Sequence, residues 1–478
     1  MRSLASASVP FLIFGAVVIL LSNLVRNSIW RRGLLLIASA VFLWLCADGE
    51  TLIPFIAFVA LGYAGLKLIE TGRLRSSTPM VVLTVAIFIW LKRYTFLPPQ
   101  IFLHFPYTVL GLSYILFRVL HLFEDAGSGA LPQPVSIFSY LAYTLNFTTL
   151  VAGPIQRYQE FDATLREGKR PSLVVAGRAI ERIVVGFFKA NVAALAFSTL
   201  QTGAIARITA ATDEKSRILA GATAIAAYAF FLYCNFSGYI DIVIGVAQLI
   251  GIRLPENFNR PFSATSFIDF WNRWHITLST WLKTYVYNPL LMALMRRNPS
   301  EASAPAWGVI AFFVTFFLVG AWHGQTSSFL FFGVLQGLGV SINKIYEIFL
   351  TARIGRKGVK ALNANGFYLA ISRGLTFTWF TFTLLWFWSN WTQLALLAKA
   401  MGPRSVISAL ALVFLTATVG LWLWETARKL LLGIRWSGEV VLQSRYTRTA
   451  WCTALMLIAI MTELLIRQQA PEIVYKAF

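Results

Sequence analysis

The chain has 478 residues, of which 57% are hydrophobic and only 13% are charged. Because an average soluble domain carries about 25% charged residues, this composition excludes a secreted enzyme, a cytosolic enzyme and a disordered chain. The mean hydropathy is +0.67 over the whole sequence, so the apolar excess is not confined to one anchor. We therefore expect an all-α, polytopic membrane protein.

Basic residues outnumber acidic ones, with 41 Lys and Arg against 20 Asp and Glu, which gives a formal net charge of +21. The basic residues lie in short gaps between apolar runs, which is the pattern of charges that orient membrane helices. We therefore expect the protein to associate with a lipid bilayer and not with nucleic acid. The three cysteines, Cys46, Cys234 and Cys452, are widely separated. They predict neither a disulfide framework nor a metal site.

A membrane-spanning helix needs about 20 mostly apolar residues. Runs of this kind lie at Val9–Val25, Gly33–Ala47, Thr51–Ile69, Tyr107–Phe123, Val135–Val151, Leu173–Leu200, Ile218–Cys234, Gly238–Ile252, Ala306–Trp322, Ser328–Ile348, Phe367–Trp388, Val406–Trp424 and Ala450–Ile466. They predict about 11–13 transmembrane or re-entrant helices in a single membrane domain over residues 1–478. Met80–Leu91 is short for a span, and we expect it to be re-entrant or tilted. The first run lacks a small-residue cleavage site after it, so we expect a retained helix rather than a signal peptide.

The charges of the first loops predict the orientation of the chain. Arg26, Arg31 and Arg32 follow the first apolar run, whereas the next gap holds Asp48 and Glu50 and no basic residue. Since basic loops stay in the cytoplasm, we expect the N-terminus to lie outside.

One segment, Leu254–Pro289, is too polar to face lipid and too rich in Trp and Phe for an ordinary solvated loop. One interpretation is an interfacial amphipathic helix that Trp271, Trp274 and Trp281 anchor at the membrane surface. The other is a re-entrant segment that forms the floor of a polar cavity, with His275 directed inward. The sequence pattern leaves both interpretations open.

A second histidine, His323, ends an apolar run and is followed by Gly324. An ionisable side chain within a membrane segment indicates a functional site, because burying it is costly. A neutral imidazole is the cheapest such group to bury, and it can give or take a proton near pH 7. A structural histidine bonded to a backbone carbonyl is the alternative. Gly320 and Gly324 would let another backbone or a ligand approach closely.

The residues around both histidines resemble the membrane-bound O-acyltransferase family, in particular its bacterial branch of alginate O-acetylation and teichoic acid D-alanyl transfer proteins. The matching stretches are Val151–Arg157, Phe236–Asp241, Leu254–Pro261, Trp271–Ser279, Trp322–Gly324 and Gly333–Gly337. They place the catalytic core at about residues 145–340, in the order and spacing of the family.

The resemblance implies helices around a central tunnel, in which an acyl group passes from a cytoplasmic thioester to a hydroxyl acceptor. It implies that His323 is the active-site histidine and that His275 is the second histidine of the site. Removal of the hydroxyl proton by a positioned imidazole accelerates such a transfer by about 10²- to 10⁴-fold. We expect His323 to take this proton, and His275 to orient the substrate or donate a hydrogen bond to the developing charge.

Further residues near the two histidines are candidates for binding the substrates. We expect oxyanion or substrate contacts from Asn272, Arg273, Ser279 and Trp322, and donor contacts from Arg157 and Arg260. The sequence has no Gly-x-Ser-x-Gly elbow and no cluster of metal ligands, so we expect neither a covalent serine intermediate nor a zinc mechanism. His121 is expected to be structural.

Three functions are compatible with these observations. The first is transfer of an acyl group, which we expect to be acetyl from acetyl-CoA with no bound cofactor, toward an exported polysaccharide at the bacterial inner membrane. The second is D-alanyl transfer from a carrier protein to teichoic acid. The third is a transporter without acyl chemistry, which the lack of a second, paired broken helix disfavours. Because the expected outside loops are short, we expect a separate exported or membrane-anchored acyltransferase to complete the modification.

Overall fold

The computed structural model describes residues 7–25, 27–46, 52–107, 109–300, 303–436, 439–466 and 471–474. The regular structure in these residues is helical except for two paired antiparallel strands, β1 (Arg435–Trp436) and β2 (Glu439–Val440). The predicted all-α class is confirmed. Arg26, Asp48 and Glu50, on which the predicted orientation partly depends, lie outside the described residues.

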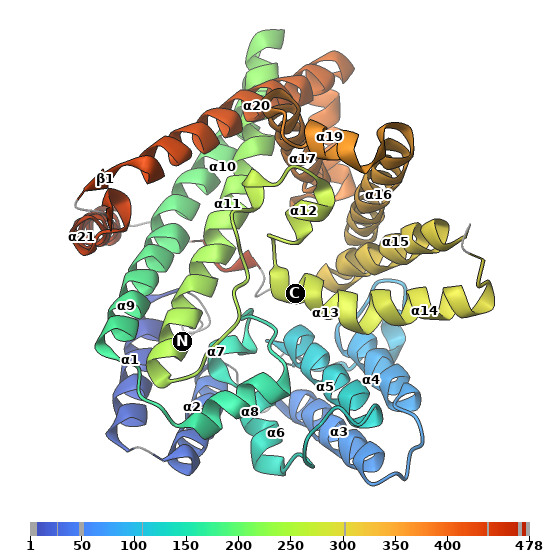
Figure 1. The fold of residues 1–478 in the computed structure, drawn as a ribbon, viewed down its shortest axis with the longest axis vertical. Coiled ribbons are helices and arrows are strands. Elements are labelled where there is room, and N and C mark those ends of the chain that lie inside the picture. Colours follow the sequence, from blue (N-terminus) through green and yellow to red (C-terminus); the bar gives the residue numbers. More distant parts are fainter. Residues whose placement is uncertain are drawn as a thin grey trace. The chain divides into compact units, whose positions relative to one another are not determined.

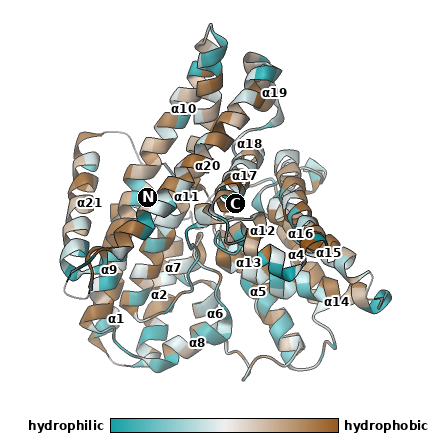
Figure 2. Ribbon diagram, turned by 45° about the horizontal axis from the view of Figure 1, so that its top comes forward, coloured by the Kyte–Doolittle hydropathy of each residue, from teal (hydrophilic) through white to brown (hydrophobic). Residues whose placement is uncertain are grey.

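Eight helices in the described residues are long and apolar enough to cross a membrane. They lie at Ser28–Cys46, Ile53–Glu70, Leu173–Ala210, Glu214–Ile250, Ala304–His323, Ser327–Leu362, Pro403–Gly433 and Arg445–Leu465. Two shorter apolar helices, Val9–Leu24 and Thr78–Leu91, add to them. In each of the last two long helices, only 11% of the most apolar 18-residue stretch is buried inside the protein. Such exposed apolar surface is typical of helices that face lipid. Apolar residues are spread over most helices (Figure 2).

The chain divides into two compact units. The first unit comprises Met1–Val192, Asn235–Glu256 and Leu455–Phe478, and the second comprises Ala193–Cys234 and Asn257–Ala454. That residues 1–478 work as a single membrane domain stays a prediction.

The first unit holds the N-terminal helices, drawn in blue to green in Figure 1. They are α1 (Val9–Leu24), α2 (Ser28–Cys46), α3 (Ile53–Glu70), α4 (Thr78–Leu91), the 3₁₀-helix η3 (Pro99–Ile101), α5 (Leu112–Gly127), α6 (Ile137–Thr144), α7 (Phe147–Leu150), α8 (Tyr158–Glu167) and α9 (Leu173–Phe188).

The second unit holds both predicted site histidines, His275 and His323. Its elements are α10 (Ala194–Ala210), η5 (Pro261–Ser263), α12 (Phe267–Trp271), α13 (Ile276–Leu282), the π-helix η6 (Lys283–Tyr287), α14 (Asn288–Arg297), α15 (Ala304–His323), α16 (Ser327–Leu362), α17 (Gly366–Thr383), α18 (Leu385–Trp388), α19 (Trp391–Met401), α20 (Pro403–Gly433), the two strands and η7 (Val441–Gln443). The π-helix η4 (Lys189–Ala193), α11 (Glu214–Ile250) and α21 (Arg445–Leu465) have residues in both units.

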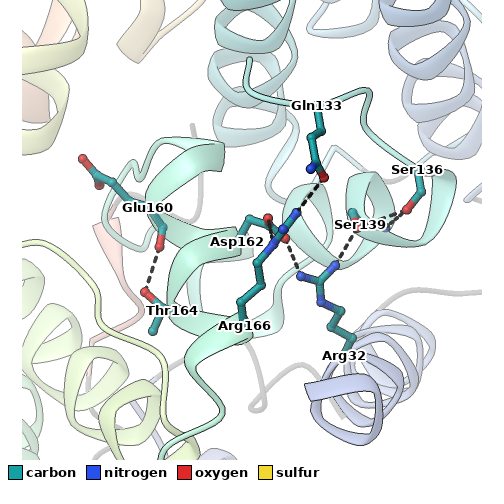
Figure 3. A network of polar contacts seen from close by, with 8 residues as sticks. All are labelled: Arg32, Gln133, Ser136, Ser139, Glu160, Asp162, Thr164 and Arg166. Carbon is teal, nitrogen blue, oxygen red and sulfur yellow. Dashed lines mark hydrogen bonds and ion pairs between the residues drawn. The ribbon is translucent and has the colours of Figure 1, made fainter. Parts of the chain in front are cut away.

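A polar network fixes three helices of the first unit to one another (Figure 3). The carboxylate of Asp162 on α8 accepts hydrogen bonds from Arg32 on α2 and from Arg166, one turn farther along α8. Arg32 also donates to the hydroxyl of Ser139 on α6. Charge-assisted bonds of this kind are about twice as strong as neutral ones, so the network orients α2, α6 and α8.

Three predicted spans differ from the observed helices. The predicted separate spans at Ile218–Cys234 and Gly238–Ile252 form one helix, α11, because the residues between them include no proline. The predicted span Val135–Val151 is broken into α6 and α7. There Arg118 of α5 donates to the carbonyl oxygens of Tyr143, Thr144 and Thr149, which replaces hydrogen bonds that a continuous helix would make.

Candidate active site

The segment Leu254–Pro289 folds back on itself, which positions the first predicted histidine. Phe258 and Trp274 form an isolated antiparallel bridge. On either side of it, the Asn259 amide donates to the Arg273 carbonyl at 2.9 Å, and the Ile276 amide donates to the Asn257 carbonyl at 3.0 Å. This pairing places Asn257 beside His275.

The tryptophans of this segment are buried in the protein. Trp271, Trp274 and Trp281 expose only 3%, 2% and 9% of their surface. Interfacial anchors would be exposed to the headgroup region. Their burial therefore favours the second sequence interpretation, in which the segment forms the floor of a cavity.

Asn257 fixes the tautomer of the buried His275 ring. The Asn257 Oδ1 lies 3.2 Å from His275 Nδ1. The same oxygen accepts two hydrogen bonds from Thr277, one from its backbone amide at 3.1 Å and one from its hydroxyl at 2.8 Å. Because a backbone N–H can only donate, the Asn257 atom at this position is the oxygen. His275 Nδ1 must therefore carry a proton, and Nε2 of the neutral ring carries a lone pair.

The backbone of His275 is in an unusual conformation. Its φ of 46° and ψ of 52° lie in the left-handed region, where only a few per cent of non-glycine residues are found. Such strain, about 1–3 kcal/mol, persists where the surrounding structure imposes it and clusters at functional sites. Here the pairing with residues 257–259 imposes it, and helix α13 begins directly afterwards.

His323 is the last residue of α15 and is also buried, with 2% of its surface exposed. Its ring centroid lies 4.7 Å from that of Trp322 and 5.1 Å from that of Phe387. The Trp322 ring centroid lies 6.2 Å from that of His275. The structure thus brings the two predicted histidines together, with Trp322 against both rings.

Three glycines let α15 and α16 pack closely enough to hold His323 in place. The two helices lie side by side in Figure 1. A Cβ atom on Gly320 would lie 2.3 Å from the Gly333 backbone, and one on Gly337 would lie 2.8 Å from the Phe313 carbonyl oxygen. Small residues at such spacing permit close contact between membrane helices.

A partly open pocket lies beside α13, with about 400 Å³ of space that protein atoms do not fill, including open solvent at its mouth. It is lined by Ile268, Trp271, Asn272, Ser279, Lys283, Tyr287, Phe312, Thr315, Phe316 and Val340. Two of its donors, Trp271 Nε1 and Ser279 Oγ, are buried and have no hydrogen-bond partner among the described residues. The pocket therefore offers donors to an acceptor atom of a ligand.

The other predicted site residues are in different surroundings. Asn272 and Ser279 line the pocket, whereas Arg273 pairs with Asp269 on the same chain segment at 2.9 Å. Arg260 lies in the second unit beside Glu425, and Arg157 is exposed in the first unit at the start of α8.

His121 is held in the first unit by hydrogen bonding. Its Nε2 accepts from the Tyr158 amide at 3.0 Å, and its Nδ1 lies 3.4 Å from Asp125. Both ring nitrogens are occupied by the fold, as expected for a structural histidine. Within the described residues, no three His, Cys, Asp or Glu side chains gather as a metal site would require.

Asn257 lies at the site beside His275 and was not among the sequence candidates. The signal for Asn257 was its position in the Leu254–Pro261 motif. Its role depends on a pairing with residues 18 positions away, which no local pattern reveals. Lys283 begins the π-helix η6 and lines the pocket.

Comparisons with known proteins identify related sequences. Residues 55–387 match the sequence profile of MBOAT, the membrane-bound O-acyltransferase family. The teichoic acid D-alanyltransferase of Bacillus subtilis (strain 168) is 30% identical over 240 residues, which cover 50% of this chain and 59% of that protein. The probable alginate O-acetylase AlgI of Azotobacter vinelandii is 28% identical over 314 residues, 65% of this chain and 60% of that protein. The peptidoglycan O-acetyltransferase of Helicobacter pylori is 32% identical over 230 residues, 45% of this chain and 40% of that protein. The chain thus spans about three fifths of the first two relatives and two fifths of the third.

Proposed function

The chain belongs to the membrane-bound O-acyltransferase family, and on that premise we propose that it transfers an acyl group from a thioester donor toward hydroxyl groups of an exported polysaccharide. The acyl group is acetyl, its donor is acetyl-CoA at the cytoplasmic face, and the enzyme lies in a bacterial inner membrane. The observation that carries the proposal is the pair of buried imidazoles, His275 and His323, against one tryptophan, Trp322.

The two histidines share the proton chemistry. Attack of a hydroxyl oxygen on the thioester carbonyl requires loss of the hydroxyl proton, forms the ester bond, and breaks the carbon–sulfur bond of the donor. His323 accepts this proton, and the thiolate that leaves takes it up as the thiol. The contact with Asn257 changes the expectation for His275, since Nε2 of its neutral ring can accept but not donate. We therefore assign His275 as a second proton carrier rather than an oxyanion donor.

The oxyanion of the tetrahedral intermediate needs donors that are already in place. Trp271 Nε1 and Ser279 Oγ are buried and face no protein acceptor in the described residues, and Asn272 lines the same pocket. One such donor contributes about 3–4 kcal/mol in known acyl-transfer sites. Arg273 is not assigned this role, because its charge is paired with Asp269.

The test uses purified protein with acetyl-CoA and an oligosaccharide acceptor, and measures thiol release and ester formation. His323→Ala should abolish transfer while the protein elutes as a single species. His275→Gln should lose as much activity as His275→Ala, because glutamine has no basic nitrogen. If His275→Gln keeps most of the activity, the group donates a hydrogen bond and the proton-carrier role is wrong. If His323→Ala keeps more than about a tenth of the turnover, His323 is not a general base.

A second donor is favoured by one observation, the similarity to teichoic acid D-alanyltransferases over half of the chain. In this alternative the acyl group is D-alanyl on a carrier protein and the acceptor is teichoic acid. The same assay separates the two, because the wild-type enzyme would release thiol from only one of the two thioesters.

A further inference from the structure

In the second unit, two arginines lie beside the buried carboxylate of Glu425 on α20, and a third is linked to it through Ser263. Arg428, one turn farther along α20, donates to it at 3.3 Å, and Arg260 Nη1 lies 3.9 Å from it. Ser263 donates its hydroxyl to the same carboxylate, and its backbone carbonyl accepts from Arg373 Nε of α17 at 3.3 Å. We call Arg260, Arg373 and Arg428 the arginine cluster.

The arginine cluster holds more positive charge than the protein neutralises. The cluster and Glu425 together carry a formal charge of +2, from three guanidinium groups and one carboxylate. The terminal nitrogens of Arg373 make no hydrogen bond to any described residue, and the Arg260 side chain lies beyond hydrogen-bond distance of Glu425. Arg373 and Arg428 are half-buried, so water screens their charges incompletely. An anion with two negative charges would complete this arrangement.

The backbone of Arg260 has an unusual conformation, which the surrounding structure must hold in place. Its φ of 47° and ψ of 63° place it in the left-handed region, as for His275. The following turn, η5, begins at Pro261 and supplies Ser263 to Glu425. The strained residue and the hydroxyl that orients the carboxylate therefore lie on one short turn.

The arginine cluster lies toward the helix ends that carry the basic loops. Arg373 is seven residues after the start of α17, about 10 Å along the helix, and Arg428 is five residues before the end of α20. The C-terminal half of α16, just before α17, carries Arg353, Arg356, Lys357 and Lys360. By the positive-inside rule these ends face the cytoplasm, where acyl thioesters are made.

We propose that the arginine cluster is a binding site for a phosphate or diphosphate group. A phosphate carries two charges and accepts paired hydrogen bonds from guanidinium groups, which matches the free donors of Arg373 and Arg260. Two molecules at the cytoplasmic face supply such a group: the nucleotide end of an acyl-CoA donor, and the headgroup of an anionic lipid. The first of these rests on the proposed function, since it makes the cluster part of the donor site.

The test compares Arg373→Gln and Arg260→Asn with the wild type, in nanodiscs of zwitterionic lipid. Asparagine tolerates the left-handed region, so the second variant removes the charge without added strain. Arg353→Gln, an exposed cation on α16, is the matched control. Calorimetric binding of CoA, which has no acyl group to transfer, should weaken at least tenfold in each cluster variant and stay unchanged in the control. The KM for acetyl-CoA should rise by a similar factor, with kcat within about twofold.

A second arm distinguishes the source of the phosphate. Anionic lipid is titrated into the nanodiscs, and thermal stability is measured for the same variants. A rise in wild-type stability that Arg373→Gln abolishes, with unchanged CoA binding, would identify a lipid headgroup as the ligand. Unchanged CoA binding and unchanged lipid response in both variants would overturn the phosphate site. Failure of the proposed function looks different: the wild type would bind CoA but would not consume any thioester.

Discussion

Asn257 determines which nitrogen of His275 can act as a base, because its oxygen is already committed to the Thr277 amide. Replacing it with alanine removes the acceptor for His275 Nδ1–H and lets the other tautomer form. We expect Asn257→Ala to lower kcat by about 10- to 100-fold with little change in the donor KM, an effect in the range of lost general-base catalysis. Since the variant also leaves the Thr277 donors without their acceptor, a loss of about 1–3 kcal/mol in stability is expected.

Asn257→Asp separates the role in catalysis from the role in folding. It keeps the oxygen acceptor and adds a negative charge, which favours the protonated His275 ring. Because the reaction needs the neutral ring, the acid limb of the pH–rate profile should move to higher pH, with activity kept at alkaline pH. A merely structural Asn257 would give a variant whose profile is unshifted. The measurement is kcat from pH 5 to 9 beside the wild type.

The sequence singled out two histidines, but it did not predict how the protein holds them. His323 and His275 were both found from their motifs, and the structure brings them to one tryptophan. The tautomer of His275 depends on Asn257, which reaches it through a chain reversal rather than through helical spacing. The contact between Arg260 and Glu425 is likewise invisible to local patterns, because the two residues are 165 positions apart in the sequence.

At the scale of elements, the close crossing of α15 and α16 is what carries His323 into the site. We expect Gly320→Ala to separate the two helices, since its new Cβ would lie 2.3 Å from backbone atoms of Gly333, and backbone cannot rotate away. Overpacking of this kind costs about 1–3 kcal/mol. Activity should fall together with the melting temperature in detergent.

A glycine on the same helix provides the control for this substitution. A Cβ on Gly308 of α15 would meet only the Tyr287 hydroxyl, at 3.8 Å, which is ordinary contact. Gly308→Ala should therefore leave activity unchanged and, because alanine favours the helix, should not lower stability. Equal effects of the two substitutions would show that helix propensity rather than helix contact governs this region.

Hydropathy predicted the positions of apolar elements more reliably than their continuity. It placed a break between residues 234 and 238, where polar Asn235 and Gly238 interrupt the apolar run, yet α11 continues through them. Asn235 Nδ2 donates to the carbonyl of Glu472, and Asn235 Oδ1 accepts from the Val474 amide. The opposite error, a continuous span at Val135–Val151, arose because Arg118 compensates the broken backbone from another helix.

For the whole molecule, the question is where the acyl group goes after it leaves the donor. The pocket beside α13 is partly open and is lined by ten side chains. A polysaccharide chain needs an extended groove, and the spacing of the apolar runs in the sequence predicts only short outside loops to build one. We therefore expect the chain to pass the acyl group to a separate exported or membrane-anchored protein that modifies the polymer.

Liposomes test this transfer directly. With labelled acetyl-CoA inside and polysaccharide outside, the wild-type protein should release thiol into the lumen but leave the polymer nearly unlabelled. Adding the expected separate acyltransferase on the outside should raise polymer labelling at least tenfold, whereas His323→Ala liposomes with the same addition should show neither thiol release nor label. The His323→Ala control matters because leaked acetyl-CoA could acetylate the added protein without passage through the membrane enzyme. Efficient labelling of the polymer by wild-type liposomes alone would show that this chain carries out both steps, and the separate partner would then be unnecessary.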